Sequence, residues 1–236
     1  MMDKVVLITG GSKGIGLGIA EVLKRSGSKV AISGRNSETI ELAVNSLNQI
    51  TTGEVMGLVS DVRDFNSVKT AVNKIIDKWG SLDVVVANAG LGHFAPIEEM
   101  TLDQWNQVID TNLTGVFHTV KASIPSLKES EGYIITIASL AGTNFFPTGS
   151  AYSASKFGLV GFSQAIMLDL RKYKIKVTTI MPGSVTSEFN DHSPSQADDW
   201  KIQPEDIGQM VLDLLKMNPR TLPSKIEVRP SNPPST

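Results

Sequence analysis

The fold is decided by the segment Val5-Val-Leu-Ile-Thr-Gly-Gly-Ser-Lys-Gly-Ile-Gly16, in which an apolar run passes directly into a glycine-rich turn. Val5–Thr9 is typical of a strand buried on both faces, and a helical pattern of apolar residues starts at Ile15. Glycines let the backbone approach a pyrophosphate, and the N-terminus of the following helix offers N–H donors. The segment lacks the Gly-Lys-Ser/Thr ending of a nucleoside triphosphate loop. It therefore predicts a dinucleotide-binding turn, although the glycines alone also fit a plain tight turn.

The next predicted strand, Lys29–Ser33, leads into a segment that carries a cation and no carboxylate. A dinucleotide-binding fold places its ribose-reading residue here, about 20 residues past the glycines. An acidic side chain would accept hydrogen bonds from the free 2′-hydroxyl of NAD, but positions 33–36 hold none. Arg35 offers a planar cation suited to a phosphate, and Lys13 could reach the same side. We therefore expect NADP(H); the alternative is that both cations are solvated surface charges.

Apolar strand-like runs alternate with amphipathic helical patterns along the chain, which predicts an α/β fold. Further strands are expected at 54–60, 82–87, 133–138, 174–181 and 225–229, and further helices at 37–50, 64–78, 101–128, 150–173 and 203–217. Right-handed crossovers favour one doubly wound, Rossmann-type parallel sheet of order 3-2-1-4-5-6-7 with helices on both faces. Residues 1–236 are expected to form a single domain, with 187–201 as a lid over the substrate and 230–236 as a flexible tail.

Polar and small residues follow several predicted strands. Asp61-Val62 comes after the third strand, where the carboxylate could accept a bond from an adenine amine or cap the next helix. Asn88-Ala-Gly90 suits a tight turn with room for a ribose. Asn112 lies in the apolar middle of the predicted helix 101–128. A buried amide must be hydrogen-bonded, so we expect Asn112 to hold either backbone or water.

The predicted strand 133–138 delivers Ser139 to a strand end, and a helical pattern begins near Ser150. Tyr152 and Lys156 are four residues apart and share one face of that helix. A fixed cation near a phenol lowers the phenol pKa from about 10, which makes the pair a candidate acid/base device. Ser139 could hold a substrate oxygen against the phenol. Taken alone, Tyr-x-x-x-Lys is also compatible with a surface helix.

Composition limits the classes of function. The chain has 236 residues, 41% hydrophobic and 19% charged, with a net charge of −2 and a pI near 5.9. No basic patch suggests a nucleic-acid binder. The absence of cysteine excludes disulfides and thiolate catalysis, and His118 and His192 have no partners that suggest a metal. No apolar stretch approaches the roughly 20 residues of a membrane span, so a cytoplasmic protein without membrane contact is expected.

Together these motifs resemble the short-chain dehydrogenase/reductase family over nearly the whole chain. Thr9–Gly16 is similar to its cofactor loop, Asn88–Gly90 to its sheet-stabilising turn, and Pro182-Gly183 with Thr186 to its nicotinamide-side motif. Lys13 with Arg35 matches the NADP-preferring subgroup. The usual glycine-rich C-terminal end is replaced by Lys225-Ile-Glu-Val-Arg-Pro-Ser-Asn-Pro, which weakens the expectation of the tetramer contact that many members make there.

The resemblance implies an oxidoreductase in which NADPH delivers hydride to a carbonyl carbon. Asn112, Ser139, Tyr152 and Lys156 fall where the family's catalytic tetrad falls. Ser139 would hydrogen-bond the carbonyl oxygen, and Tyr152 would donate the proton. Lys156 would bind the nicotinamide ribose and lower the tyrosine pKa, while Asn112 would hold a relay water. The expected cofactor contacts are Gly10, Ser12, Lys13, Gly14, Ile15, Gly16, Arg35, Asp61, Val62, Asn88, Ala89, Gly90, Tyr152, Lys156, Pro182, Gly183, Val185 and Thr186.

The substrate is less defined than the cofactor. His93, Phe145 and Phe146 are expected to line its pocket together with the lid, and the variant is similar to small carbonyl reductases. A homodimer or tetramer is expected through the long helices. Two alternatives stay open: a 3-oxoacyl-[acyl-carrier-protein] reductase, for which no clear basic docking patch is visible, and a non-catalytic NADP(H)-binding sensor.

Overall fold

A single parallel sheet of seven strands forms the centre of the computed structural model, which describes residues 3–189 and 192–234. The strand order is β3-β2-β1-β4-β5-β6-β7, which confirms the predicted fold class and order. The strands are β1 (Val5–Thr9), β2 (Lys29–Gly34), β3 (Val55–Val59), β4 (Val84–Ala87), β5 (Tyr133–Ile137), β6 (Lys176–Pro182) and β7 (Lys225–Val228). Every residue of β1, β4 and β5 is buried, as expected for strands covered on both faces.

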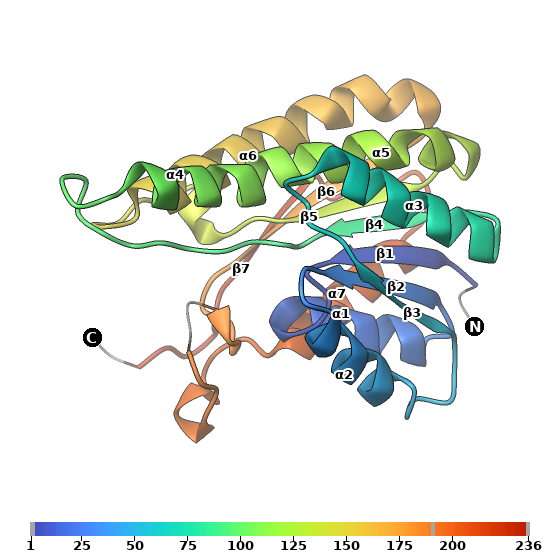
Figure 1. The fold of residues 1–236 in the computed structure, drawn as a ribbon, viewed down its shortest axis with the longest axis horizontal. Helices are drawn as coiled ribbons and strands as arrows, with labels where there is room; N and C mark the ends of the chain where they lie inside the picture. The colour runs from blue at the N-terminus through green and yellow to red at the C-terminus, as the bar shows by residue number, and fades with distance from the viewer. Residues whose placement is uncertain (1–2, 190–191, 235–236) are drawn as a thin grey trace.

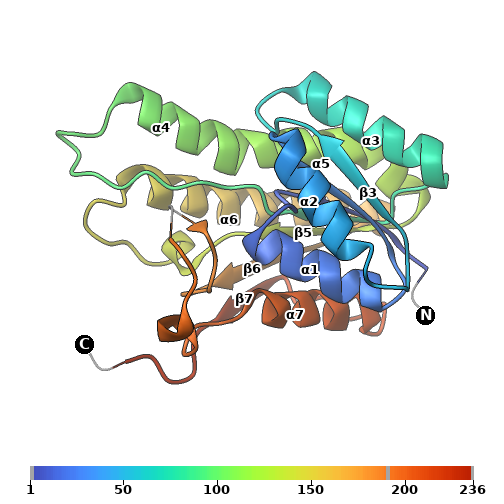
Figure 2. The same cartoon turned by 60° about the horizontal axis from the view of Figure 1, so that its bottom comes forward.

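Helices cover both faces of the sheet (Figure 1 and Figure 2). The first layer consists of α1 (Gly14–Arg25), α2 (Ser37–Leu47) and α7 (Pro204–Lys216). The second consists of α3 (Phe65–Trp79), α4 (Leu102–Ile109), α5 (Gly115–Glu129) and α6 (Ser150–Leu170). Alternate residues of β1 pack into the two layers, Val6 with the first and Leu7 with the second. α1 and α7 come close because Gly18 carries no side chain: a Cβ there would lie 2.5 Å from that of Pro204.

The predicted helix 101–128 differs from the structure in one respect. Its middle is the π-helical segment η1 (Asp110–Thr114), which separates α4 from α5 and contains the buried Asn112. Thr101 caps α4, accepting a hydrogen bond from the backbone N–H of Gln104. Single π turns are frequent at functional sites, so this irregularity directs attention to Asn112.

Short 3-10 segments complete the chain: η2 (Leu140–Gly142), η3 (Arg171–Tyr173) and η5 (Gln196–Asp198). The predicted lid 187–201 follows β6, and its far end returns to the fold through a bridge between Val185 and Ile202. Residues 190–191 of that lid, residues 235–236 of the predicted tail and residues 1–2 lie outside the described part of the chain. In the ranges 3–189 and 192–234, no helix is long and apolar enough to cross a membrane.

Candidate active site

A cavity of about 700 Å³ opens at the carboxyl ends of the strands. Parallel strands of a doubly wound sheet bind ligands at this edge. The cavity brings together most of the residues that the sequence indicated: Gly10, Ser12, Lys13, Gly14, Ile15, Arg35, Asp61, Val62, Asn88, Ala89, Gly90, Ser139, Tyr152, Lys156, Pro182, Gly183 and Val185. Six other predicted residues do not line its wall: Gly16, His93, Asn112, Phe145, Phe146 and Thr186.

The glycine loop is shaped by backbone contacts that leave no room for side chains. Gly10 and Gly14 have φ angles of +64° and +51°, a conformation that L side chains rarely adopt. A Cβ on Gly16 would collide with the Gly10 carbonyl oxygen. The side-chain amide of Asn88 fixes the loop, because it donates hydrogen bonds of 3.0 Å to the carbonyls of Thr9 and Gly10. The turn Asn88–Gly90 therefore holds the glycine loop in its bent form.

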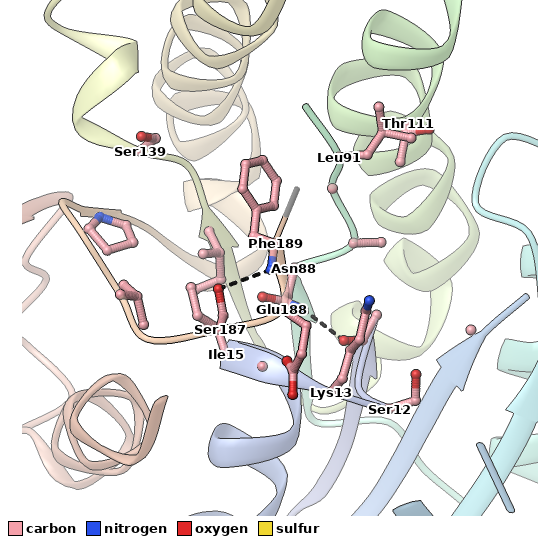
Figure 3. Close-up of a pocket in the computed structure, with 18 of the residues that line it drawn as sticks. Ser12, Lys13, Ile15, Asn88, Leu91, Thr111, Ser139, Ser187, Glu188 and Phe189 are labelled. Atoms are coloured by element: carbon pink, nitrogen blue, oxygen red, sulfur yellow. Dashed lines mark hydrogen bonds between the residues drawn. The ribbon is translucent and has the colours of Figure 1, made fainter. Parts of the chain in front are cut away.

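The N-terminus of α1 faces the cavity with no side chain capping it. The N-cap residue, Lys13, is extended and exposed, and its backbone carbonyl accepts from Leu17. The first N–H groups of a helix have no partners within the helix, so an uncapped start can bind an anion. Lys13 and Ile15 are seen at this position in Figure 3.

The far end of the cavity is built by α2 and the residues after β3. Arg35 is exposed beside the N-terminus of α2. Asn36 caps this helix, because its side-chain oxygen accepts a hydrogen bond from the backbone N–H of Thr39. Asp61 is held by Arg63, with 2.6 Å between its Oδ2 and a guanidinium nitrogen. Hydrogen bonding from Arg63 is the main cause that lowers the pKa of Asp61, and Arg35 contributes a smaller electrostatic effect.

The two interpretations of Asp61 are separated by the structure. The cap of α3 is Asp64, which accepts a hydrogen bond from the backbone N–H of Asn66. Asp61 lines the cavity instead. Its carboxylate borders the cavity while paired with Arg63.

Tyr152 and Lys156 lie on one face of α6, as the spacing predicted. The Lys156 Nζ is 5.6 Å from the centre of the Tyr152 ring and donates a hydrogen bond of 3.0 Å to the carbonyl of Ile137. Burial lowers the pKa of Lys156 to about 8. Ser139 adopts an extended backbone at the end of β5, and its Oγ accepts from the backbone N–H of Ala141.

The electrostatic effect on Tyr152 differs from the expectation. Burial raises the pKa of its phenol, and hydrogen bonding with Ser139 offsets part of that rise. The physical reason is that Lys156 is buried and Tyr152 is half-buried: removing water disfavours the phenolate and the ammonium alike. In the free protein the phenol is therefore protonated at neutral pH, and the pKa of Lys156, about 8, lies close to neutral pH.

Asn112 is fully buried and clamps the segment after β4. Its side-chain oxygen accepts from the Leu91 backbone N–H, and its amide donates to the Leu91 carbonyl, both over 2.9 Å. The same amide also donates to the Ser155 hydroxyl over 3.0 Å. These bonds show that the Asn112 amide holds backbone, which is one of the two partners expected from the sequence.

Aromatic rings surround the outer side of Tyr152. The ring centres of Phe94 and Phe189 lie 5.5 and 5.6 Å from that of Tyr152, and the ring of Phe146 lies 5.8 Å from Phe94. The other two predicted pocket residues do not join this group. His93 is 3.2 Å from the side-chain oxygen of Gln107, and Phe145 is 85% exposed.

Residues after β6 supply part of the wall that the sequence did not indicate individually. Ser187, Glu188 and Phe189 lie in the pocket beside the glycine loop (Figure 3). A Cβ on Gly14 would be 3.2 Å from that of Ser187 and 3.5 Å from a Glu188 carboxylate oxygen. Only their place between a strand end and a helix could have indicated them, because neither a period nor a charge pattern marks these residues.

One buried carboxylate, Asp198, organises the end of the predicted lid. It binds Lys201, the Nε2 of His192 at 2.8 Å and the backbone N–H of Ser195 at 3.0 Å. Its backbone carbonyl accepts from the Thr186 hydroxyl. Thr186 therefore has a structural bond within the described residues, and the lid is tied to the end of β6.

Known proteins resemble this chain in both sequence and structure. The protein-family model for short chain dehydrogenase matches residues 4–198. An uncharacterized oxidoreductase of Staphylococcus aureus (strain MW2) is 33% identical over 232 residues, covering 98% of each chain. An alcohol dehydrogenase from the archaeon Thermococcus sibiricus, solved with 5-hydroxy-NADP, superimposes with a TM-score of 0.92 at 30% identity over 100% of both chains. A metagenomic short-chain oxidoreductase in complex with NADP gives 0.85 at 29% identity over 98% of both.

Proposed function

Because this chain belongs to the short-chain dehydrogenase family of oxidoreductases, we propose that it interconverts a carbonyl and a secondary alcohol with NADP(H). The observation that carries the proposal is the convergence of Ser139, Tyr152 and Lys156 on the same cavity as the glycine loop. NADP(H) supplies the hydride when it is bound. The 5-hydroxy-NADP and NADP in the similar structures support this choice of cofactor.

The residues present fit such a dinucleotide. The uncapped start of α1 suits a pyrophosphate, and the crowded glycines let the backbone approach it. Lys13 and Arg35 are exposed cations that suit a 2′-phosphate, while the neighbouring Asp61 is already paired with Arg63. Asn88–Gly90, Pro182-Gly183 and Val185 would hold the rest of the molecule, whereas the Thr186 hydroxyl is bonded to the Asp198 carbonyl.

The proposed proton chemistry rests on Tyr152. Its phenol, with a pKa raised by burial, is the proton donor to the carbonyl oxygen, and Ser139 orients that oxygen by a hydrogen bond. Lys156, with a pKa of about 8, can hold and release a proton near neutral pH. Asn112 acts as a positioning residue, because its bonds to Leu91 fix the segment that borders the cavity.

Replacing Tyr152 by Phe tests this proposal. Loss of an acid/base group lowers turnover by about 100-fold or more, while NADPH binding is expected to stay within a few-fold of wild type. The assay is NADPH oxidation, followed by absorbance, over a panel of ketones, with NADPH affinity measured separately by fluorescence. Tyr173→Phe is the control, because Tyr173 also has a lysine over its ring, Lys128 at 3.8 Å, but does not line the cavity. Full activity in Tyr152→Phe would remove the phenol from the mechanism.

The same assay separates the remaining alternatives. Turnover of an acyl thioester in preference to every free ketone would favour a 3-oxoacyl-[acyl-carrier-protein] reductase. NADPH binding with no turnover of any carbonyl would favour a sensor.

We also propose a cytoplasmic homo-oligomer, a dimer or tetramer. Exposed apolar side chains on its long helices support this, such as Phe117 and Phe157, each 43% exposed, and a solution mass measurement tests it.

A further inference from the structure

Three phenylalanine rings from three separate loops form a wall on the outer side of Tyr152. Phe94 follows β4, Phe146 follows η2, and Phe189 follows β6. Phe94 stands edge-on to the Tyr152 ring, with 62° between the ring planes, and it also contacts Phe146 and Phe189. We call these three residues the aromatic wall. Phe94 and Phe189 contact the Tyr152 ring directly, and Phe146 extends the wall through Phe94. Of the three rings, Phe189 also lines the cavity.

The aromatic wall is packed on one side and open on the other. Its inner edge is tight, because a Cβ on Gly92 would lie 2.8 Å from Phe94 and 2.9 Å from Phe189. Its outer edge is exposed: Phe146 and Phe189 show 43% and 37% of their surface to solvent. Removing apolar area from water is favourable, so a ligand that covers the open part of this wall binds more tightly.

Charges near the wall disfavour an anionic ligand. The Glu188 side chain is exposed and adds a negative charge next to Phe189. Lys201 and His192 also line the cavity, but both are bound by the carboxylate of Asp198. Lys156 donates to the Ile137 carbonyl and belongs to the proton chemistry. Among the residues of this wall and the described part of the lid, no lysine or arginine side chain without a bonding partner is left to pair with the carboxylate of a substrate.

We propose that the preferred substrate is an uncharged ketone that carries an aromatic ring, seated on the aromatic wall. This inference rests on the proposed carbonyl reduction and deepens it by naming the substrate class. Edge-to-face and offset ring contacts contribute beyond the area that they bury, which makes the enzyme distinguish a phenyl ring from a saturated ring of similar size. A keto acid lacks a counter-ion here and is a poorer substrate.

Three ketones with the same carbonyl environment test the inference: benzylacetone, its cyclohexyl analogue and its para-carboxylate. In each, two methylene groups separate the ring from the carbonyl, so intrinsic reactivity is matched. We expect kcat/KM for benzylacetone to exceed that of the cyclohexyl analogue by about 2- to 10-fold. The para-carboxylate is expected to be poorer than benzylacetone by about 10-fold or more.

Variants tie the preference to the wall. In Phe189→Leu, and separately in Phe146→Leu, the ratio of phenyl to cyclohexyl kcat/KM is expected to fall towards one. Phe65→Leu is the control, because Phe65, the first residue of α3, pairs with His118 of α5 and not with the rings of the wall, and it should leave the ratio unchanged. The inference is overturned, and the proposed function left standing, if kcat/KM for the cyclohexyl or carboxylate substrate equals that for benzylacetone. The same holds if the phenyl to cyclohexyl ratio does not change in either wall variant. No turnover of any ketone overturns the proposed function, and the inference with it.

Discussion

Lys156 provides a prediction whose size can be worked out from the structure. An unburied lysine has a pKa of about 10.4, and burial lowers that of Lys156 to about 8. Holding the ammonium inside the protein therefore costs about 3 kcal/mol at pH 7. Between roughly pH 8 and 10.4 the unfolded chain binds more protons than the native protein, so the free energy of unfolding rises with pH across that window.

Lys156→Met removes this contribution and keeps a side chain of similar length. The variant leaves the Ile137 carbonyl without its donor, a loss of about 1–3 kcal/mol that does not depend on pH. We therefore expect the wild-type free energy of unfolding, relative to that of the variant, to rise by about 2 kcal/mol between roughly pH 7 and 9.5.

Urea denaturation of the cofactor-free protein at several pH values, followed by circular dichroism, measures this difference. Lys69→Met, at an exposed position on α3, controls for the loss of a surface charge. A wild-type and variant pair whose free energies stay parallel over the whole range would refute the assignment of a burial-depressed pKa to Lys156. The proton-holding role proposed for this residue would then lose its support.

Three further predictions concern the cofactor side of the cavity. Arg35→Asp should reduce the preference for NADPH over NADH by about 10-fold or more, measured as the ratio of kcat/KM, because a carboxylate replaces the cation that suits a 2′-phosphate. Asn112→Ala should destabilise the protein to urea by about 2–4 kcal/mol, because both backbone groups of Leu91 lose their partner. Gly16→Ala should lower the free energy of unfolding by about 1–3 kcal/mol and abolish NADPH binding, because the new methyl group would collide with the Gly10 carbonyl.

Each of these has its own contradicting result. An unchanged cofactor ratio in Arg35→Asp argues against the 2′-phosphate assignment, and Arg25→Asp on the far end of α1 is its control. An Asn112→Ala protein as stable as wild type would mean that water replaces the amide. Wild-type affinity in Gly16→Ala would show that the loop can open, with Gly161→Ala as the control because a Cβ there meets nothing within 4 Å.

The centre of the sheet was predictable because β1, β4 and β5 are buried on both faces and so leave short, continuous apolar runs. β1, for example, has the predicted bounds Val5–Thr9. The helix 101–128 was wrong in its middle, because a π turn has no periodic signature of its own. The amide of Asn112 drew attention in the sequence, yet its partner, Leu91, lies 21 positions earlier and could not be derived from spacing.

The chemistry was less predictable than the positions. Sequence spacing brings Tyr152 and Lys156 to one helix face, but the pKa of each depends on burial by loops that spacing does not describe. The same limit applies to Glu188 and Phe189, which enter the cavity because the chain after β6 turns back to Asp198. Tertiary contacts of this kind have no local signal.

The glycine turn combines two kinds of position with opposite tolerance to change. Gly10 and Gly16 are fixed by steric exclusion, so any replacement there disrupts the bend itself. Lys13 and Arg35 are exposed side chains at the rim of the same cavity. Under the proposed cofactor contacts, exchange of these two exposed residues would change the nucleotide preference while the bend of the glycine turn stays intact.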